Sequence, residues 1–362
     1  MTGSDLTVRD VMSPGVPPVV AEGNLLDAAK RLHGFGIPAL PVVDAGGRCL
    51  GVLTAWDVVR AIAMESDLGS TSAAELVSHH EPLSPDQRLE VAARRGGPLT
   101  PVVENGLYVG VLTRADVAAA ERAAKLLGPS AAAIRWEISP NDTMHSGIRG
   151  SYLMAGLYAL EWIRTGMETA GEERLDVIVD LPCGHGRVLR VLRAAFPQAK
   201  LVACDLDREG VDFCASTFGA EPVYSDSEPA NIRIGRVADL VWVGSLLTHL
   251  PPARWPGFLD LFERTLRPGG LLVVTTFDRP REMFLRSMAV GDPEAMLRAR
   301  DDEGFSFRPY EGEPGYGLML AAPEWVRDRF AETSFEVVRH APRGWFPPGP
   351  AQDVWICRAA GS

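Results

Sequence analysis

The sequence of 362 residues has few cysteines and no long apolar run. Its five cysteines are odd in number and lack the paired spacing of metal sites, so we expect free thiols and no metal. No stretch reaches the roughly 18 consecutive apolar residues of a membrane helix, and residues 1–10 lack the apolar core of a signal peptide. These absences predict a cytoplasmic protein without a membrane partner.

The chain also lacks an excess of positive charge. Its formal net charge is −11 at pH 7, and a surface of that sign repels the phosphates of nucleic acids and anionic lipids. We therefore expect no nucleic-acid partner. With 46% hydrophobic and 23% charged residues, the composition is that of an ordinary globular protein, and the length predicts two or three domains.

Residues 176–207 show the pattern of a strand, a turn, a helix and a second strand. An apolar run ends at Asp180, a turn with Gly184 and Gly186 follows, and apolar residues then recur at helical spacing. A second apolar run ends at Asp205. This order is typical of a doubly wound α/β fold with a parallel sheet. The two glycines let a ligand approach the backbone at a helix N-terminus.

The same turn favours a nucleoside over a dinucleotide. A dinucleotide site needs a third glycine for close packing beneath a pyrophosphate, and that position is Leu189. Asp205 ends the next strand, where a carboxylate can accept hydrogen bonds from the two hydroxyls of a ribose. The pattern therefore disfavours a nicotinamide oxidoreductase and fits a nucleoside without a pyrophosphate better.

The stretches Asp180-Leu-Pro-Cys-Gly-His-Gly and Cys204-Asp-Leu-Asp resemble the first two motifs of class I S-adenosylmethionine-dependent methyltransferases. Residues 238–250 resemble the family's fourth strand and the loop after it, and residues 266–277 resemble its Pro-Gly-Gly turn and fifth strand. One departure is Pro182, where many members have glycine. The resemblance implies a Rossmann-like, seven-stranded domain over residues 136–362, with an antiparallel last strand and S-adenosylmethionine as cofactor. It implies cofactor contacts from Asp180, Pro182, Cys183, Gly184, Gly186, Asp205, Leu206, Ser225, Asp226, Gly244 and Ser245. Asp226 is equally well explained as a solvated turn residue.

The catalytic and acceptor residues follow from the chemistry of methyl transfer. Substitution at a sulfonium depends on alignment, and a hydroxyl acceptor also needs a base. We take His249 as the first candidate base and His145 as the second, although His249 could instead cap the following helix or only pack. Acceptor contacts are expected before the first core strand and in the Met- and aromatic-rich insertion 278–322, from Asn141, Asp142, Met144, Tyr152, Phe284 and Tyr310. The alternatives are turn residues at 141–142 and a helical core patch in the insertion.

Residues 1–122 contain an internal repeat. The segment from Pro41 through Gly51-Val-Leu-Thr54-Ala-Trp-Asp57 returns about 60 residues later, ending in Gly-Val-Leu-Thr113-Arg-Ala-Asp116. Each copy predicts a strand, a hairpin turn, a second strand and a helix, preceded by a helix at 25–34 or 89–95. An Ala-rich helical linker is expected at 118–135.

The repeat resembles a tandem cystathionine-β-synthase (CBS) domain pair, or Bateman module. The resemblance implies a cleft for ATP, AMP or another adenosine ligand, lined by Thr54, Asp57, Thr113, Arg114 and Asp116. The Thr and Asp residues are also natural helix N-caps. Since dimerisation is the commoner role of such modules, we expect a homodimer.

These patterns predict a CBS pair (1–122), a linker (123–135) and a methyltransferase domain (136–362). The predicted activity is S-adenosylmethionine-dependent O- or N-methylation of a small-molecule acceptor, such as a secondary metabolite or a sugar. The alternative is a sensor that binds S-adenosylmethionine and an adenosine ligand without turnover.

Overall fold

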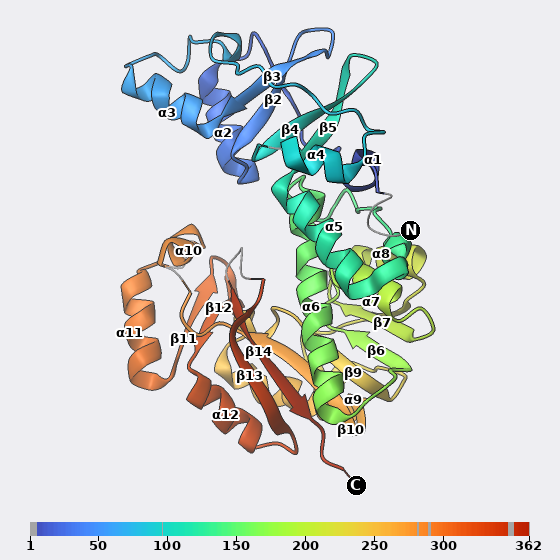
Figure 1. Cartoon of the computed structure of the whole chain (residues 1–362). Helices are drawn as coiled ribbons and strands as arrows, with labels where there is room; N and C mark the ends of the chain where they lie inside the picture. Colours follow the sequence, from blue (N-terminus) through green and yellow to red (C-terminus); the bar gives the residue numbers. More distant parts are fainter. Residues whose placement is uncertain (1–5, 96, 281, 289–290, 347–350, 362) are drawn as a thin grey trace. The chain divides into compact units, whose positions relative to one another are not determined.

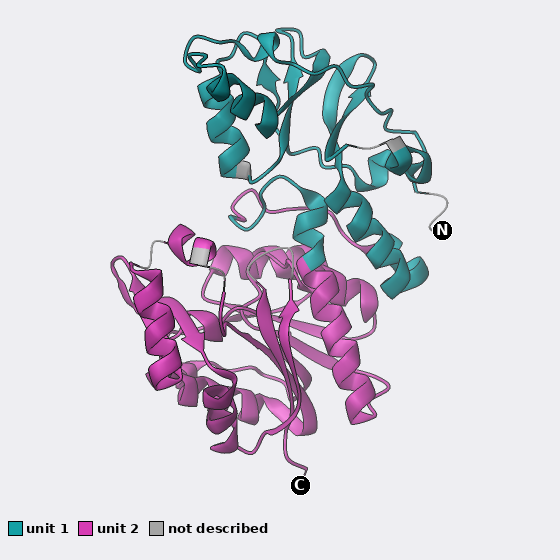
Figure 2. Ribbon diagram, turned by 60° about the vertical axis from the view of Figure 1, so that its left-hand side comes forward, with its two compact units in different colours: residues 1–132, 143–154 teal, residues 133–142, 155–362 magenta. Residues whose placement is uncertain are grey.

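The computed structural model describes residues 6–95, 97–280, 282–288, 291–346 and 351–361. The chain forms two compact units, shown in different colours in Figure 2. Unit 1 comprises residues 1–132 and 143–154, and unit 2 comprises residues 133–142 and 155–362. The sequence predicts a CBS pair (1–122), a linker (123–135) and a methyltransferase domain (136–362). Residues 143–154, which lie within the predicted methyltransferase domain, group with unit 1.

Unit 1 contains two copies of a helix, a strand hairpin and a second helix (Figure 1). The first copy consists of α2 (Leu25–Phe35), β2 (Ala39–Val43), β3 (Cys49–Thr54) and α3 (Ala55–Ala63). The second copy consists of α4 (Leu89–Arg95), β4 (Leu99–Glu104), β5 (Leu107–Thr113) and α5 (Arg114–Leu127). The remaining elements are α1 (Val8–Val11), β1 (Val19–Val20), η1 (Ala73–Glu75) and η2 (Gly128–Ala133). The predicted repeat is confirmed.

One glycine in each copy lets a loop pair closely with the second strand of the hairpin. Ser78 pairs with β3, and Ser13 pairs with β5. A Cβ on Gly51 (φ +149°) would lie 2.3 Å from the carbonyl oxygen of Ser78, and one on Gly110 (φ +157°) would lie 2.9 Å from that of Ser13. Both positions therefore require glycine, which explains its place in the repeat.

Unit 2 is built on a seven-stranded sheet with the order β13-β14-β10-β9-β6-β7-β8. Its parallel strands are β6 (Val177–Asp180), β7 (Lys200–Asp205), β8 (Glu221–Tyr224), β9 (Ala238–Val243) and β10 (Leu266–Thr276). Strand β14 (Gln352–Arg358) runs antiparallel to β10 and to β13 (Glu336–Trp345). The predicted seven strands and antiparallel last strand are confirmed.

Helices cover both faces of this sheet, and each face has its own apolar core. Residues of α6 (Arg149–Ala170), α7 (Leu189–Ala195) and α8 (Arg208–Phe218) pack on one face. Residues of α9 (Trp255–Thr265) and α12 (Pro323–Ala331) pack on the other. Three short helices, η3 (Pro229–Asn231), η4 (Leu247–His249) and η5 (Pro252–Arg254), lie in the loops around β9. The result is a three-layer α/β/α arrangement.

The insertion after β10 folds as a small structure of its own. It contains α10 (Glu282–Ser287), α11 (Pro293–Glu303) and the antiparallel hairpin of β11 (Phe305–Tyr310) and β12 (Glu313–Ala321). Its apolar centre includes Phe277, Leu285, Met296, Leu318 and Leu320. In the described part of the chain, no helix is long and apolar enough to cross a membrane.

Candidate functional site

Strand β6 ends at a carboxylate that is buried without a hydrogen-bond partner. Asp180 is 2% exposed, and neither of its side-chain oxygens has a partner among the described residues. Burial and the nearby charge of Asp205 raise the pKa of Asp180 well above its ordinary value. An unpaired buried carboxylate is costly, so this position favours a ligand that supplies a donor or a positive charge.

The turn after β6 follows this carboxylate directly in the chain. Gly184 (φ +48°) and Gly186 (φ +77°) have left-handed conformations. A Cβ on Gly186 would lie 2.3 Å from the Phe218 ring, whereas one on Gly184 would meet nothing within 4 Å. Gly186 therefore allows the turn to pack against α8, and Gly184 faces open space. Pro182 follows a cis peptide bond, and Cys183 is buried.

Asp205, at the end of β7, connects the first two predicted cofactor motifs. Its carboxylate accepts hydrogen bonds from the backbone N–H of Gly184 at 2.7 Å and of Asp207 at 3.0 Å. Burial raises its pKa, although both hydrogen bonds act in the opposite direction. Each carboxylate oxygen has a second lone pair, so the group can still accept from a ligand hydroxyl. Leu206, the next residue, is 64% exposed.

A polar network that the sequence did not reveal holds the loop after β9. The N–H of Ser245 (φ +60°) donates to Thr275 Oγ1 at 2.8 Å, and its hydroxyl lies 3.1 Å from that of Thr248. Gln352 donates from Nε2 to Ser245 Oγ at 2.9 Å and accepts from Thr275 at 2.5 Å. A Cβ on Gly244 would clash with an indole of β9. Gln352 lies 107 residues from Ser245 in sequence, so no local signal could identify it.

His249 contacts the insertion through its Nδ1 atom. This atom lies 2.8 Å from the carbonyl oxygen of Gly317 and 3.1 Å from the hydroxyl of Tyr310. Because a carbonyl oxygen only accepts, Nδ1 carries the proton and Nε2 carries the lone pair. Burial lowers the pKa of His249 from its ordinary value of 6.5, so the imidazole is neutral at pH 7. A neutral ring in this tautomer can take up a proton at Nε2.

The side chain of Tyr316 contacts His249 and lies near Asp205 of the second cofactor motif. The ring of Tyr316 stacks on that of His249, with 5.1 Å between centroids and 30° between planes. Burial raises the pKa of Tyr316, and the negative charge of Asp205 adds to the shift. An electrostatic effect of this kind requires the two groups to be close. Tyr316 therefore lies near both the candidate base and the candidate ribose carboxylate, and a joint site of the two stays a prediction.

The other predicted cofactor residues lie at the end of β8. The N–H of Ser225 donates to the carbonyl oxygen of Asp205 at 2.8 Å, which keeps this loop beside β7. Asp226 accepts from the N–H of Glu228 at 2.7 Å, and this bond lowers the pKa of Asp226. Asp226 is thus a turn residue, as the alternative explanation of the sequence predicts. Its contact with a cofactor stays a prediction.

The predicted acceptor residues fall into both units. Asn141 belongs to unit 2 and donates from Nδ2 to Glu209, in the first turn of α8, at 2.7 Å. Asp142, also in unit 2, is buried, and its N–H donates to a backbone carbonyl at 3.1 Å. Phe284 and Tyr310 pack against the apolar centre of the insertion. Of these residues, Tyr310 contacts His249 directly, and the acceptor roles of all four stay predictions.

His145, Met144 and Tyr152 group with unit 1. The ring of His145 makes an edge contact with that of Tyr152, with centroids 5.4 Å apart. Met144 is 63% exposed. Their predicted roles at the acceptor stay predictions. In the segment before β6, residues 143–154 group with unit 1, whereas residues 133–142 and 155–176 group with unit 2.

In unit 1, the repeated Thr and Asp residues form capping boxes at the start of α3 and α5. Thr54 and Asp57 exchange hydrogen bonds in the first copy, as do Thr113 and Asp116 in the second. The helix-cap reading of these residues is therefore confirmed, and their contact with a nucleotide stays a prediction. Asp57 also accepts from Arg60 at 3.1 Å.

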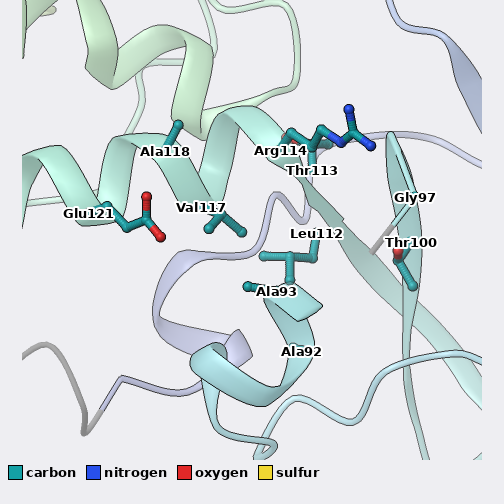
Figure 3. A pocket seen from close by; sticks show the side chains of 10 residues that line it. All are labelled: Ala92, Ala93, Gly97, Thr100, Leu112, Thr113, Arg114, Val117, Ala118 and Glu121. Carbon is teal, nitrogen blue, oxygen red and sulfur yellow. The ribbon is translucent and has the colours of Figure 1, made fainter. Parts of the chain in front are cut away.

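A cavity of about 260 Å³ lies in the second copy (Figure 3). Its walls come from α4, β4, β5 and α5, and they include Thr113 and Arg114, two of the predicted nucleotide residues. Glu121 and Thr100 supply further polar groups. Asp116 is not part of its lining.

Comparison with known protein families finds one match in each unit. Residues 8–64 match the CBS domain, and residues 178–270 match a methyltransferase domain. The chain therefore contains a CBS domain and, after it, a methyltransferase domain. The two matches agree with the repeat of unit 1 and with the glycine turn and sheet of unit 2.

Individual relatives match about a third of the chain. Hypoxic response protein 1 of Mycobacterium tuberculosis is 30% identical over 118 residues, which are 31% of this chain and 82% of that protein. L-aspartate semialdehyde sulfurtransferase of Methanocaldococcus jannaschii is 29% identical over 114 residues, 30% of this chain and 22% of that enzyme. A solved CBS domain pair in complex with 5′-methylthioadenosine and S-adenosyl-L-methionine is 26% identical, covers 31% of this chain and 93% of its own, and has a TM-score of 0.27.

Proposed function

We propose that the methyltransferase domain transfers a methyl group from S-adenosylmethionine to a hydroxyl or amine of a small-molecule acceptor, and that the CBS module binds an adenosine nucleotide. The observation that carries the first part is the unpaired carboxylate of Asp180 beside the open turn at Gly184. Asp205, on the adjacent strand, is hydrogen-bonded to that same turn.

The residues at this turn fit a positively charged nucleoside. The ammonium group of the methionyl part would give Asp180 the partner that it lacks. Asp205 would accept from the ribose hydroxyls, and Gly184 would let the sugar approach the backbone. Leu189 is fully buried at the position where a dinucleotide fold needs its third glycine. The site thus favours a nucleoside over a dinucleotide.

S-adenosylmethionine supplies a methyl group already activated on sulfur, so the protein must mainly align and deprotonate the acceptor. In this proposal His249 takes the acceptor proton at Nε2. The hydrogen bond to Gly317 holds the required tautomer, and stacking on Tyr316 fixes the ring. The insertion places the rings of Tyr310 and Tyr316 beside this histidine. An apolar or aromatic acceptor fits such surroundings best.

Formation of S-adenosylhomocysteine tests the proposal. The full chain is incubated with S-adenosylmethionine and a panel of phenols, alcohols and amines, and the product is quantified by mass spectrometry. Product formation that His249→Asn abolishes supports the assignment. Tight binding of S-adenosylmethionine by calorimetry, without product from any acceptor class, supports the non-catalytic sensor instead.

The CBS module also supports a proposal of self-association. Helix α3 exposes Trp56, Val59 and Ile62 at helical spacing, with Trp56 72% and Ile62 57% exposed, and Met64 follows. Monomeric proteins rarely expose a contiguous apolar patch of this kind. We propose that a second copy of the chain covers this α3 face.

A further inference from the structure

The carboxylate of Asp116 in the second CBS copy is fully occupied by the protein itself. Its Oδ2 accepts from the N–H and the hydroxyl of Thr113, at 2.8 and 2.7 Å. Its Oδ1 accepts from the hydroxyl of Ser13 at 2.7 Å and from the backbone N–H of Gly150 at 2.8 Å. Asp116 is only 2% exposed. All four donors belong to unit 1, and Gly150 lies in the first turn of α6.

The hydroxyl of Ser13 connects Asp116 to Arg149, the residue before Gly150. While it donates to Asp116, it accepts from the backbone N–H of Arg149 at 2.8 Å. The Arg149 guanidinium also donates to the carbonyl oxygen of Met12 at 3.2 Å. Two N–H groups at the start of α6 thus find acceptors in Ser13 and Asp116, and a carboxylate at a helix N-terminus is favourable.

Apolar contacts also pack residues 148–150 against the rest of unit 1. Ile148 is 4% exposed and belongs to the core cluster that contains Val16 and Val111. Gly150 makes the closest approach, since a Cβ there would lie 2.3 Å from the backbone of Ala115. A real Cβ never comes so near, so only glycine permits this fit.

In the first copy, the equivalent carboxylate has different hydrogen-bond partners. Asp57 has the same capping box with Thr54, but its Oδ1 pairs with Arg60, a residue of its own helix. The side chain of Arg60 is 51% exposed. A rotation of one surface side chain therefore frees Asp57, whereas Asp116 is freed only when backbone moves.

We propose that residues 147–150 are a tethered occupant of the second CBS cleft, and that an adenosine nucleotide reaches Asp116 only after the first turn of α6 withdraws. The inference rests on the proposed nucleotide binding of the CBS module. The first cleft then binds without such a displacement. The apparent affinity of the second cleft is reduced by the small fraction of molecules in which the segment has withdrawn.

Two variants of the full chain release the segment without altering a predicted nucleotide residue. Gly150→Ala adds the forbidden Cβ, and Ile148→Ser removes the apolar anchor. Met144→Ser is the matched control, because Met144 lies in the same segment but is exposed. Hydrogen exchange with mass spectrometry follows the amides of residues 147–152, and equilibrium dialysis with AMP as the probe counts bound nucleotides.

The wild type and Met144→Ser should protect these amides and bind one AMP per chain, and Asp57→Asn should remove that AMP. Gly150→Ala and Ile148→Ser should exchange at least tenfold faster at 147–152 and bind a second AMP. The inference is wrong if exchange does not change in either variant, or if released variants still bind one AMP. If no variant binds any AMP, the nucleotide part of the proposed function fails as well, and methyl transfer is then judged by its own assay.

Discussion

His249 and Gly317, 68 residues apart in sequence, are joined by a hydrogen bond of 2.8 Å. This bond decides which nitrogen of the imidazole can take a proton, because the carbonyl oxygen of Gly317 requires the proton on Nδ1. The insertion therefore does more than cover the site. It sets the tautomer of the candidate base.

His249→Asn should lower kcat by roughly 10²- to 10⁴-fold, the usual contribution of a general base, and leave the affinity for S-adenosylmethionine unchanged. An asparagine amide can still donate to Gly317, so the loss reports proton transfer. Because burial lowers the pKa of His249, the wild-type rate should fall only when the pH drops below about 6.5. The variant should lack this acidic limb. An unchanged kcat would show that His249 only packs.

Asp205→Asn should weaken S-adenosylmethionine binding by about 1.5–3 kcal/mol, which is the value of a hydrogen bond to a charged group. The change keeps the shape of the side chain but removes acceptor capacity beside the open turn at Gly184. Isothermal calorimetry measures the affinity. Asp67→Asn is the control, because that carboxylate accepts from the N–H of Gly69 in its own turn and has no predicted role at the cofactor. Equal losses in both variants would contradict a specific role of Asp205.

Sequence reasoning succeeded where the determinants are local. The strand that ends at Asp180, the glycine turn and the helix after the turn are each encoded by neighbouring residues. The same is true of the capping boxes of Asp57 and Asp116. It failed where distant residues decide. Gly150 donates a hydrogen bond to Asp116 across 34 residues, and no local pattern shows that the first turn of α6 groups with unit 1. The hydrogen bond between Gln352 and Ser245 spans 107 residues and leaves no pattern in the sequence.

Trp56→Glu on the α3 face should convert a dimer into a monomer. The substitution places a charge in a patch with Val59 and Ile62, and an unpaired charge in an apolar interface is costly. Size-exclusion chromatography with light scattering gives the mass. Val20→Glu, at another exposed apolar position of the same unit, is the control and should keep the wild-type mass. A monomeric wild type would remove the proposed association.

Asp180→Asn should stabilise the protein at neutral pH while it impairs the site. The folded-state pKa of Asp180 lies above its ordinary value of 3.8, so the folded state holds its proton more tightly than the unfolded chain does. The contribution of this group is therefore fully present below about pH 3.8 and is lost as the pH rises through the folded-state pKa. Asparagine cannot ionise, so the variant keeps that contribution at every pH.

Thermal unfolding between pH 4 and pH 8 measures this difference. The gain in Tm of Asp180→Asn over the wild type should grow with pH, by about 2–4 °C for each kcal/mol. Asp260→Asn is the control, because Asp260 is exposed and pairs with Arg264 at the surface. S-adenosylmethionine should then stabilise the wild type more than Asp180→Asn, since only the carboxylate attracts its positive charge. A variant that is less stable at pH 8, or that gains equally from the cofactor, would contradict the role of Asp180 as a carboxylate kept unpaired for a cationic ligand.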